Sequence, residues 1–423
     1  MILSRRRRAL LPGAALCIAL SSAAFAGKET VLYTFHGFPA RDGANPLAVP
    51  VMDDKGDLYG TASAGGGSGC GMVYKLHRRQ DETWKETSLY SFSCGNDGDG
   101  PWGGVVFDKA GNLYGNTVLG GAGACLYGCG VVYKLTPAKQ GDWTETVLYS
   151  FPAPPQGSEY GGPYAGLTFD GNGKLYGTTV LDDACGDSNY GSVFRLKRVN
   201  EIWKEHDIRR FCGTDGADPS RGPLVLDAAG NLYGTTTFGG ADGDGVVFEM
   251  SPLGGDKWAF NKLHEFTNAE GGILAGGVTI DASGDLYGAE YAGGSAGHGA
   301  IYELSPSGGA WNESILHVFN AAEGENPFAS PVFDVGGNLF GTTQAGGSTQ
   351  YCINCGVIYE LVSQGSGQWS ESIVYSFGSQ PGIADGSDPV AGLMRAPDGN
   401  FYGTAAEGGD SSCNCGVVFQ FTP

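Results

Sequence analysis

One phrase recurs seven times along this chain of 423 residues, and it constrains the fold more than any other feature. In its most complete form the phrase reads Asp-x-x-Gly-Asn-Leu-Tyr-Gly-Thr, and its aromatic position recurs every 53 to 62 residues. That position holds Tyr59, Tyr114, Tyr176, Tyr233, Tyr287, Phe340 and Tyr402. Such a period indicates one supersecondary unit repeated along the chain, because a single unit cannot bury its own apolar face.

Each repeat unit contains four short segments rich in β-branched and aromatic residues and bounded by Gly, Pro and Asp, as strands are. In the second unit these segments are residues 104–108, 113–117, 131–135 and 146–151. The first two are joined by Lys-Ala-Gly-Asn, a sequence typical of a tight hairpin turn. Four strands in each of seven units predict an all-β chain folded as a seven-bladed β-propeller.

The fourth type of segment is displaced along the chain. Its first copy, residues 31–35, precedes the first complete unit, and the chain ends on a segment of the third type, residues 417–421. We therefore expect the first strand to pair with the last and to complete the seventh blade, closing the ring. An open solenoid is the alternative, but it leaves the displaced strand unexplained and exposes strand edges that closure removes.

Four phrases recur within the units: Asp-Gly-x-Asn-Pro, Gly-Asn-Leu-Tyr-Gly-Thr-Thr, Gly-Gly and Cys-Gly-Val-Val-Tyr-Glu-Leu. A chain built from them resembles the GloVer tandem-repeat family of exported bacterial proteins over nearly all of the sequence after residue 26. The resemblance implies export and a propeller-like ring, and it implies no activity. Members of that family often end in a sorting or anchoring segment, which this sequence lacks, so a secreted or periplasmic location is expected.

The first 26 residues have the features of a secretory signal peptide. Four arginines, Arg5 to Arg8, precede an apolar stretch over residues 9–20, and Ala24-Phe-Ala26 provides a small-x-small cleavage site. The apolar stretch is too short for a membrane anchor. We expect residues 1–26 to be removed and residues 27–423 to form the propeller, without a membrane span and as a monomer.

The charge of the chain excludes two broad classes of protein. The formal net charge is -20 and becomes -24 once the four arginines are removed, so the phosphates of nucleic acid would be repelled. Hydrophobic residues make up 41% and charged residues only 17%, which is not the composition of a disordered chain.

Ten cysteines follow residue 26, an even number that fits an oxidising compartment. Their placement on the loops of one face predicts five disulfide bonds. The expected pairs are Cys70 with Cys94, Cys125 with Cys129, Cys185 with Cys212, Cys352 with Cys355, and Cys413 with Cys415. The Cys352-x-x-Cys355 spacing also resembles a redox or zinc half-site, but a structural bond is the favoured interpretation in a secreted loop.

The loops between the fourth strand of one unit and the first strand of the next contain acidic turn phrases of the type Asp-Gly-x-Asn-Pro. The simpler interpretation is a shared turn, since Asp and Asn bond nearby backbone, Gly takes unusual dihedral angles and Pro fixes the exit. The alternative is a calcium site, because clustered carboxylates suit a hard cation. Its candidate ligands are Asp97 with Asp99, and separately Asp242 with Asp244.

Residues that break the repeat pattern are the better candidates for a site, because those kept in most units serve the fold. Glu290 stands where four other units have Thr, and Asp182 stands where others have Gly. A carboxylate between blades requires a partner, which Arg221 in the adjoining unit could provide. The three residues are therefore either part of a buried structural ion pair or catalytic, with an acid or base and an anion-binding arginine.

Aromatic residues beside acids are typical of sugar-binding surfaces, and Trp102, Tyr160 and Tyr164 are the candidate stacking platform. His36 and His298 fall on the face that carries the cysteines. His264 and His317 replace a tyrosine of the fourth strand and are interpreted as packing residues.

Two functions remain open at this point. The first is a secreted binding or scaffold protein that presents its loop face to an extracellular glycan or an envelope protein. The alternative is a hydrolase or lyase acting on a carbohydrate or lactone, with a carboxylate site at the channel mouth. The sequence has neither a Gly-x-Ser-x-Gly elbow nor a His-Glu-x-x-His motif, so the question of catalysis stays open.

Overall fold

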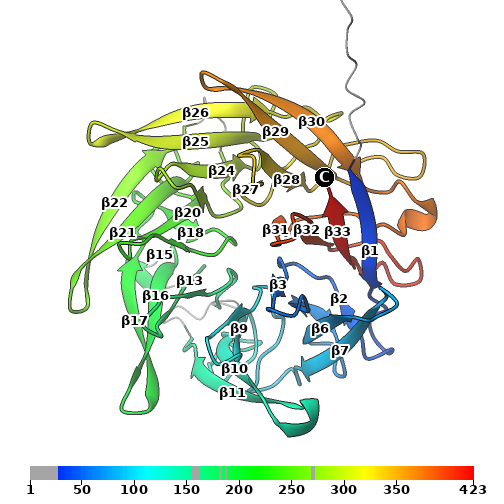
Figure 1. Cartoon of the computed structure of the whole chain (residues 1–423). Coiled ribbons are helices and arrows are strands. Elements are labelled where there is room, and N and C mark those ends of the chain that lie inside the picture. The colour runs from blue at the N-terminus through cyan, green and yellow to red at the C-terminus, as the bar shows by residue number, and fades with distance from the viewer. Residues whose placement is uncertain (1–26, 154–161, 181–182, 186–187, 268–271) are drawn as a thin grey trace, which may run out of the picture.

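The computed structural model describes residues 27–153, 162–180, 183–185, 188–267 and 272–423, which form a ring of seven β-sheets (Figure 1). Each sheet is one blade of four antiparallel strands, numbered here from blade one, which contains β3, to blade seven, which contains β1. The prediction of a seven-bladed propeller is confirmed. The predicted signal peptide, Tyr160 and Asp182 lie outside the described residues.

In blades one to six the strands follow one another in chain order from the centre of the ring outward, and in blade seven the outermost strand is β1, the first strand of the chain. The innermost strands are β3 (Val51–Met52), β8 (Val106–Phe107), β12 (Thr168–Phe169), β19 (Val225–Leu226), β23 (Thr279–Ile280), β27 (Val332–Phe333) and β31 (Leu393–Arg395). The second strands are β4 (Leu58–Ala62), β9 (Leu113–Thr117), β13 (Leu175–Thr179), β20 (Leu232–Phe238), β24 (Leu286–Glu290), β28 (Leu339–Thr343) and β32 (Phe401–Ala405).

The two outer positions are filled by longer strands. The third strands are β6 (Met72–Arg78), β10 (Val131–Pro137), β16 (Ser192–Val199), β21 (Val246–Gly254), β25 (Ala300–Ser307), β29 (Val357–Gly365) and β33 (Val417–Thr422). The outermost strands are β7 (Trp84–Ser91), β11 (Trp143–Ser150), β17 (Ile202–Arg210), β22 (Lys257–Glu265), β26 (Ala310–Val318), β30 (Gln368–Ser376) and β1 (Lys28–Thr34).

A few small elements lie outside this pattern. The short strands are β2 (Gly43–Ala44) with β5 (Ala64–Gly65), β14 (Asp183–Cys185) with β15 (Ser188–Asn189), and β18 (Ala217–Pro219), which pairs with β20. The helices in the described part of the chain are two single 3-10 turns, η1 (Lys139–Gly141) and η2 (Pro381–Ile383). Among the described residues, no helix combines the length and apolar character that crossing a membrane requires.

The repeated phrase builds the hairpin between the first and second strands. In blade two, one carboxylate oxygen of Asp108 accepts the backbone N–H groups of Ala110 and Asn112, each at 2.9 Å. The other accepts the Asn112 amide at 2.7 Å and the Tyr114 hydroxyl at 3.1 Å. Leu113, between them, is completely buried. The phrase thus fixes the turn with Asp and anchors the strand with Leu.

Three of the four strands of blade two differ in their bounds from the sequence prediction, and only the second, residues 113–117, agrees. The innermost strand is only Val106–Phe107, because these two residues alone pair with β9. The two outer strands are longer than predicted, since their ladder continues to the pair of Pro137 with Trp143. The Trp143 ring at this end packs 6.4 Å from the ring of Tyr59 in the preceding blade.

The ring is closed by the first strand of the chain, as predicted. β1 pairs antiparallel with β33, with Lys28 opposite Thr422 and Thr34 opposite Val417. Figure 1 shows β1, the first described strand, beside β33, the last strand. The seventh blade therefore contains residues from both ends of the sequence.

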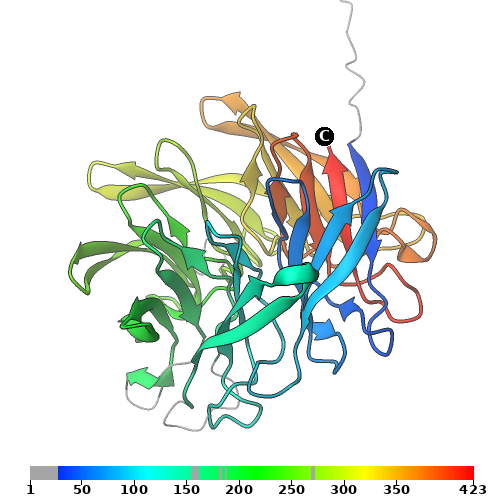
Figure 2. The ribbon, with the colours of Figure 1, turned by 60° about the horizontal axis from the view of Figure 1, so that its bottom comes forward.

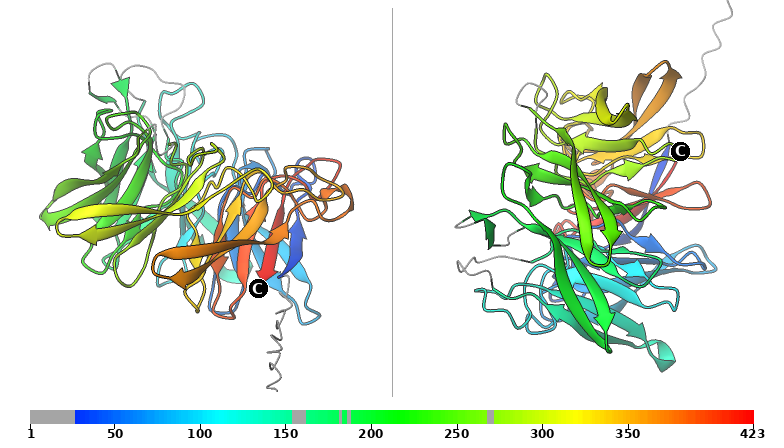
Figure 3. Two further views of the ribbon diagram at one scale, coloured as in Figure 1. Left: turned by 90° about the horizontal axis from the view of Figure 1, so that it is seen from above. Right: turned by 90° about the vertical axis from the view of Figure 1, so that its left-hand side faces the viewer.

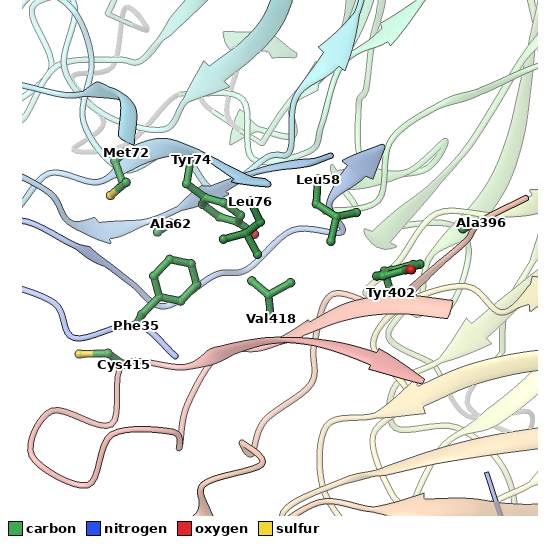
Figure 4. Close-up of a cluster of buried hydrophobic side chains, with 10 residues drawn as sticks. All are labelled: Phe35, Leu58, Ala62, Met72, Tyr74, Leu76, Ala396, Tyr402, Cys415 and Val418. Atoms are coloured by element: carbon green, nitrogen blue, oxygen red, sulfur yellow. The ribbon is translucent and has the colours of Figure 1, made fainter. Parts of the chain in front are cut away.

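A buried apolar cluster supports this closure (Figure 4). Phe35, which follows β1, packs with its ring 5.2 Å from that of Tyr74 in blade one. Val418 and Tyr402 of blade seven join Leu58 in the same cluster. The turned views in Figures 2 and 3 show the strands running between two faces that carry the connecting loops.

Candidate functional site

One face of the ring carries the loops that enter the first strand of each blade and those that join its second and third strands. The two kinds of loop are bridged to each other, for example Glu325 with Ala345 and Ser387 with Glu407. We call this face the loop face. It holds the irregular segments that differ most between blades, and it is where a specific site can be built on a rigid frame.

The acidic turn phrases on this face join neighbouring blades. Asn45, Asp218, Asn326 and Asp388 occupy the same turn position with φ between 52° and 59°, a left-handed conformation that Asn and Asp tolerate. The N–H of Asp388 bonds Cys355 of the previous blade, and its carbonyl accepts from Ala406 of its own blade. The Asn or Asp at this position therefore serves the turn that recurs between blades, through its backbone conformation and hydrogen bonds.

The acid at the start of the phrase is also used by the turn. Asp97, a predicted calcium ligand, accepts the Ser93 N–H at 2.8 Å, the Ser93 hydroxyl at 2.5 Å and the Tyr90 hydroxyl at 3.0 Å. Asp99 is bridged through its backbone to Leu119. Both lie in the same loop, but the Asp97 carboxylate already has a set of donors from the protein.

The second pair of predicted calcium ligands lies in the loop of blade four. Asp242 is exposed and Asp244 is half-buried. One carboxylate oxygen of Asp244 is buried, and the backbone carbonyl of Asp244 accepts from Ile273 at 3.4 Å. The calcium interpretation therefore stays a prediction for both pairs.

Disulfide bonds are present, as expected. The pairs described are Cys70–Cys94, Cys125–Cys129, Cys352–Cys355 and Cys413–Cys415. Cys212 is also disulfide-bonded, and the side chain of Cys185, its expected partner, lies outside the described residues. The bonds fit an extracellular or periplasmic protein, in which thiols are oxidised.

Arg221 lies among aromatic rings drawn from three other blades. Its guanidinium carbon is 5.0 Å from the ring centre of Trp102, 5.7 Å from that of Tyr164 and 5.6 Å from that of Phe328. Trp102 and Tyr164 pack edge to face at 5.0 Å. Because these residues belong to blades two, three, four and six, they meet across the ring, where the sequence analysis expected the channel mouth.

Arg221 and Glu290, the predicted pair, have different surroundings. Arg221 is exposed, whereas Glu290 is completely buried at the end of β24. Glu290 lies near the hydroxyl of buried Tyr302, whose pKa is raised well above its ordinary value by burial first and by this carboxylate next. A side chain at Gly293 would collide with the Glu290 carboxylate, so the local packing around it is tight.

The two predicted histidines each contact an acid. Nδ1 of His36 lies 3.1 Å from Asp42, and Nδ1 of His298 lies 2.6 Å from Glu325. Glu325 is in the loop that enters blade six, whereas His298 precedes β25 of blade five. The His298–Glu325 contact therefore joins the loops of two blades, whereas His36 and Asp42 lie in one loop.

A cavity of about 560 Å³ opens on the loop face over blades five, six and seven. Asp388 and Glu407 provide carboxylates, and Tyr291 provides a ring. Four amide side chains line it as well: Asn326, Gln344, Asn354 and Asn414. The lining therefore offers both hydrogen-bond donors and acceptors to the space that it encloses.

The hydrogen bonds of the loops orient two of these amides. The side-chain oxygen of Asn354 accepts the Gly346 N–H at 2.6 Å, and that of Asn414 accepts the Gly408 N–H at 2.5 Å. Since the oxygens are used by the backbone, the groups offered to the cavity are the NH₂ donors. Both residues lie between or beside disulfide-bonded cysteines, which restrict the loops that carry them.

Asp388 is the most perturbed acid in the cavity. Burial raises its pKa above the ordinary value, Glu407 raises it further, and a hydrogen bond from Gln344 partly opposes the shift. Tyr291 has a raised pKa, mainly through burial. The cavity therefore combines a carboxyl that holds its proton more strongly than usual with the more exposed carboxyl of Glu407.

The cavity adjoins the aromatic cluster around Arg221. The ring of Tyr291, which lines the cavity, lies 5.9 Å from that of Phe328, which is one of the rings around Arg221. The charge of Arg221 also lowers the pKa of Tyr291, against the larger effect of burial. The guanidinium is therefore close enough to the cavity to influence a residue of its lining.

Breaks in the repeat pattern point to Trp102, Tyr164 and Arg221 at the channel mouth and to Glu407 at the rim of the cavity. They do not single out Asp388, which follows the turn pattern, or Asn354 and Asn414. The last two share the phrase Asn-Cys-Gly at the start of the third strand, and this repeated detail was the available signal.

Comparison with known proteins identifies a family. No curated protein is a sequence match. The periplasmic gluconolactonase of Pseudomonas aeruginosa is similar in structure, with 13% identity, a TM-score of 0.49, and 78% of this chain and 86% of that chain covered. A Trypanosoma rangeli sialidase has 13% identity and a TM-score of 0.46, with 82% and 57% covered. These values carry no functional conclusion.

A third structure, the type-IX secretion system component PorZ of Porphyromonas gingivalis, has 12% identity and a TM-score of 0.49, covering 89% of this chain and 46% of that one. The family model described as the Gloeobacter/Verrucomicrobia repeat matches residues 20–198, 122–352 and 291–423. Because these overlapping matches span the whole ring, the chain belongs to the Gloeobacter/Verrucomicrobia repeat family.

Proposed function

We propose that this protein is a secreted glycan-binding protein whose site is the cavity on the loop face together with the adjoining channel mouth. The observation that carries the proposal is the lining of the cavity, in which amide donors and two carboxylates surround one space beside an aromatic ring. Sugar hydroxyls both donate and accept hydrogen bonds, so adjacent hydroxyls are matched by NH₂ groups and carboxylates. The apolar face of a sugar ring packs on aromatic side chains.

Three further features support a binding role. The cavity is built on loops that disulfide bonds hold, so less conformational entropy is lost when a ligand binds. Arg221 presents an exposed cation at one end of an otherwise acidic site, which favours a glycan with a carboxylate at that end. The N-terminal 26 residues, as a signal peptide, would deliver the protein to a compartment where such glycans occur.

The test is a thermal-shift and calorimetry screen of residues 27–423, with disulfides intact, against neutral and acidic oligosaccharides. We expect one class of oligosaccharide to stabilise the protein, and at a hundred times its Kd the gain is about 2.7 kcal/mol. Asp388→Asn and Gln344→Ala should weaken binding at least tenfold. Asn45→Asp is the matched control, because it changes the same turn position in blade one and lies outside the cavity lining.

Unchanged binding by both cavity variants would reject the cavity as the site. If no oligosaccharide binds, the partner is a macromolecule such as an envelope protein. Export is tested separately by the N-terminal sequence of the protein recovered outside the cytoplasm, which should begin at residue 27. Sedimentation of the same material tests the expected monomer.

A second function, hydrolysis or elimination at the same site, has one observation in its favour. The cavity places a carboxyl with a raised pKa, Asp388, with a second carboxylate, Glu407, which is the division of roles that acid–base catalysis on a glycan uses. Product analysis with a bound oligosaccharide distinguishes the two functions. Turnover that Glu407→Gln abolishes while binding persists would establish the enzyme.

A further inference from the structure

The boundaries between blades, which we call seams, contain three recurring side chains. The first is on the outermost strand of one blade, the second is the acid of the loop that follows, and the third is a Glu on the outermost strand of the next blade. Between blades six and seven these are Tyr375, Asp385 and Glu29. The Tyr375 hydroxyl donates to Asp385 at 2.6 Å, and the pKa of Tyr375 is raised first by burial and then by Asp385 and Glu29.

The seams on either side of blade one follow the same pattern. Tyr33 donates to Asp42 at 2.9 Å, and Tyr90 donates to Asp97 at 3.0 Å. In each case a neutral hydroxyl bonds a short acid directly. In a tyrosine seam, the side chains at the first two positions therefore satisfy each other by a hydrogen bond and need no further ligand.

The seam between blades three and four shows how a change at the first position is compensated. Arg209 replaces the tyrosine and forms an ion pair with the loop acid Asp215. The third position, a Glu in the tyrosine seams, is here Phe260, and the guanidinium lies 4.2 Å from its ring centre. A cationic first residue is therefore matched by an ion pair and a cation–π contact.

The seam between blades five and six has a different set: His317 of β26, Glu323 of the following loop and Glu371 of β30. Both of the first two residues have changed, Tyr to His and Asp to Glu. Nε2 of His317 lies 3.6 Å from the Glu323 carboxylate, beyond hydrogen-bond distance. One ligand atom from each of the three side chains lies within 4.8 Å of the others.

Buried polar atoms point to something between these three groups. Nε2 of His317 is shielded from solvent and has no hydrogen-bond partner among the described residues. Oε1 of Glu371 is also buried without a partner, as are oxygens of Glu29 and Glu86 in the tyrosine seams, so the imidazole nitrogen is what distinguishes this seam. A buried polar atom without a partner is costly, so native structures seldom retain one. Burial lowers the pKa of His317, which favours the neutral imidazole that metals bind.

We propose that His317, Glu323 and Glu371 bind a divalent transition-metal ion, with zinc as the best fit. In a tetrahedral zinc site, bonds of about 2.0–2.1 Å place ligand atoms about 3.4 Å apart. The His317–Glu323 separation already approaches this value, and small side-chain rotations bring in Glu371. The nitrogen ligand selects zinc and its neighbours over calcium or magnesium, which prefer oxygen.

The site has a route for entry and a structural consequence. The Glu323 side chain is 38% exposed, so an ion and a water as fourth ligand reach the site from the loop face. Because β26 and β30 belong to different blades, the ion links blades five and six. At this seam the ion joins the two blades, which is the role of the hydrogen bond between the tyrosine hydroxyl and the loop carboxylate in the tyrosine seams.

The experiment uses the disulfide-bonded protein after treatment with a chelator. Calorimetry and elemental analysis after zinc addition should show one tightly bound equivalent, with a rise of several degrees in Tm. A tenfold excess of calcium should not displace it. The double variant His317→Tyr/Glu323→Asp restores the tyrosine seam, so it should fold, keep its Tm in chelator and lose the bound zinc.

Two single variants make the outcome specific. His317→Gln removes only the nitrogen ligand and should lower the zinc affinity at least tenfold. His264, which lies 3.9 Å from Glu313 at the corresponding position one seam earlier, provides the matched control, since His264→Tyr should leave the His317 site unchanged. The proposal is overturned if zinc fails to bind stoichiometrically, or if the His317 variants bind it as well as the parent does.

Discussion

Gly115 determines how closely the second and third strands of blade two approach the aromatic side chain between them. A Cβ atom at this position would lie 2.4 Å from the hydroxyl oxygen of Tyr133. The equivalent glycines in three other blades, Gly60, Gly288 and Gly341, face a tyrosine in the same way. The repeated Tyr-Gly pair is therefore a requirement of packing, and it explains why the phrase tolerates so little change.

Replacing this glycine is a direct test of that explanation. We expect Gly115→Ala to destabilise the protein by about 1–3 kcal/mol, because the buried Tyr133 ring has to move. Urea unfolding measures the change. Gly171→Ala is the control, since a Cβ there meets nothing within 4 Å, and an equal loss in both variants would contradict the packing explanation.

The outermost strands contribute a ring of half-buried carboxyl groups to the seams. Burial is the main cause that raises the pKa of Glu29 to about 8 and those of Glu86 and Glu145 to about 7, from an ordinary value of 4.5. In each case a loop acid adds to the shift: Asp385, Asp42 and Asp97 respectively. Two acids at one seam cannot both ionise easily, so the strand glutamate keeps its proton.

These carboxyl groups predict a protein that is more stable in mild acid. A group whose pKa rises on folding binds its proton more tightly in the folded chain. Its stabilising effect is complete below pH 4.5 and is lost as the pH rises toward 7 to 8. The urea concentration at the midpoint of unfolding should therefore decrease when the pH is raised from 5 to 8.

Matched variants assign this effect to the seams. Glu86→Gln and Glu145→Gln remove the titrating groups and should reduce the fall in stability between the two pH values. The control is Glu82→Gln, because the Glu82 side chain is 81% exposed. A pH dependence that is the same in all variants would show that other groups are responsible.

The disulfide bonds allow a second test at the scale of elements. Cys70 and Cys94 are 24 residues apart, whereas Cys125 and Cys129 are 4 apart. From the chain entropy of the unfolded state, we expect losses of about 3.5 and about 2 kcal/mol when each pair is replaced by Ser. Unfolding of the two double variants under non-reducing conditions measures the difference, and the reverse order would contradict the entropic account.

At the scale of the molecule, stability depends on closing the ring. A chain that lacks residues 27–36 loses β1 and Phe35, and so exposes the edge of β33 and opens the cluster between blades seven and one. We expect this shortened chain to aggregate, because unpaired edges recruit other strands. Size-exclusion chromatography detects the change.

Addition of a peptide with the sequence of residues 27–36 provides the control for closure. If pairing of β1 with β33 is the missing interaction, the peptide should restore a monomeric protein with a higher Tm. A shortened chain that stays monomeric and equally stable without peptide would show that closure contributes little.

Much of the fold could be predicted because its signals are local and repeated. The spacing of Tyr59, Tyr114 and their counterparts determines the number of blades, and the displaced segment at residues 31–35 determines how the ring closes. Each unit has the same apolar pattern and the same turn residues, so seven copies of the sequence support the same assignment of strands and turns. Disulfide pairs such as Cys70–Cys94 follow from the hairpin that brings their positions together.

The tertiary structure alone decided where side chains from different blades meet. Arg221 lies against Trp102 and Phe328, more than a hundred residues away in either direction, and the cavity combines Tyr291 with Glu407. His317 has the place of a packing tyrosine in the repeat, and only its distances to Glu323 and Glu371 indicate a metal site. The physical reason is that periodicity specifies what each blade repeats, whereas a site depends on non-repeated side chains that the closed ring brings together.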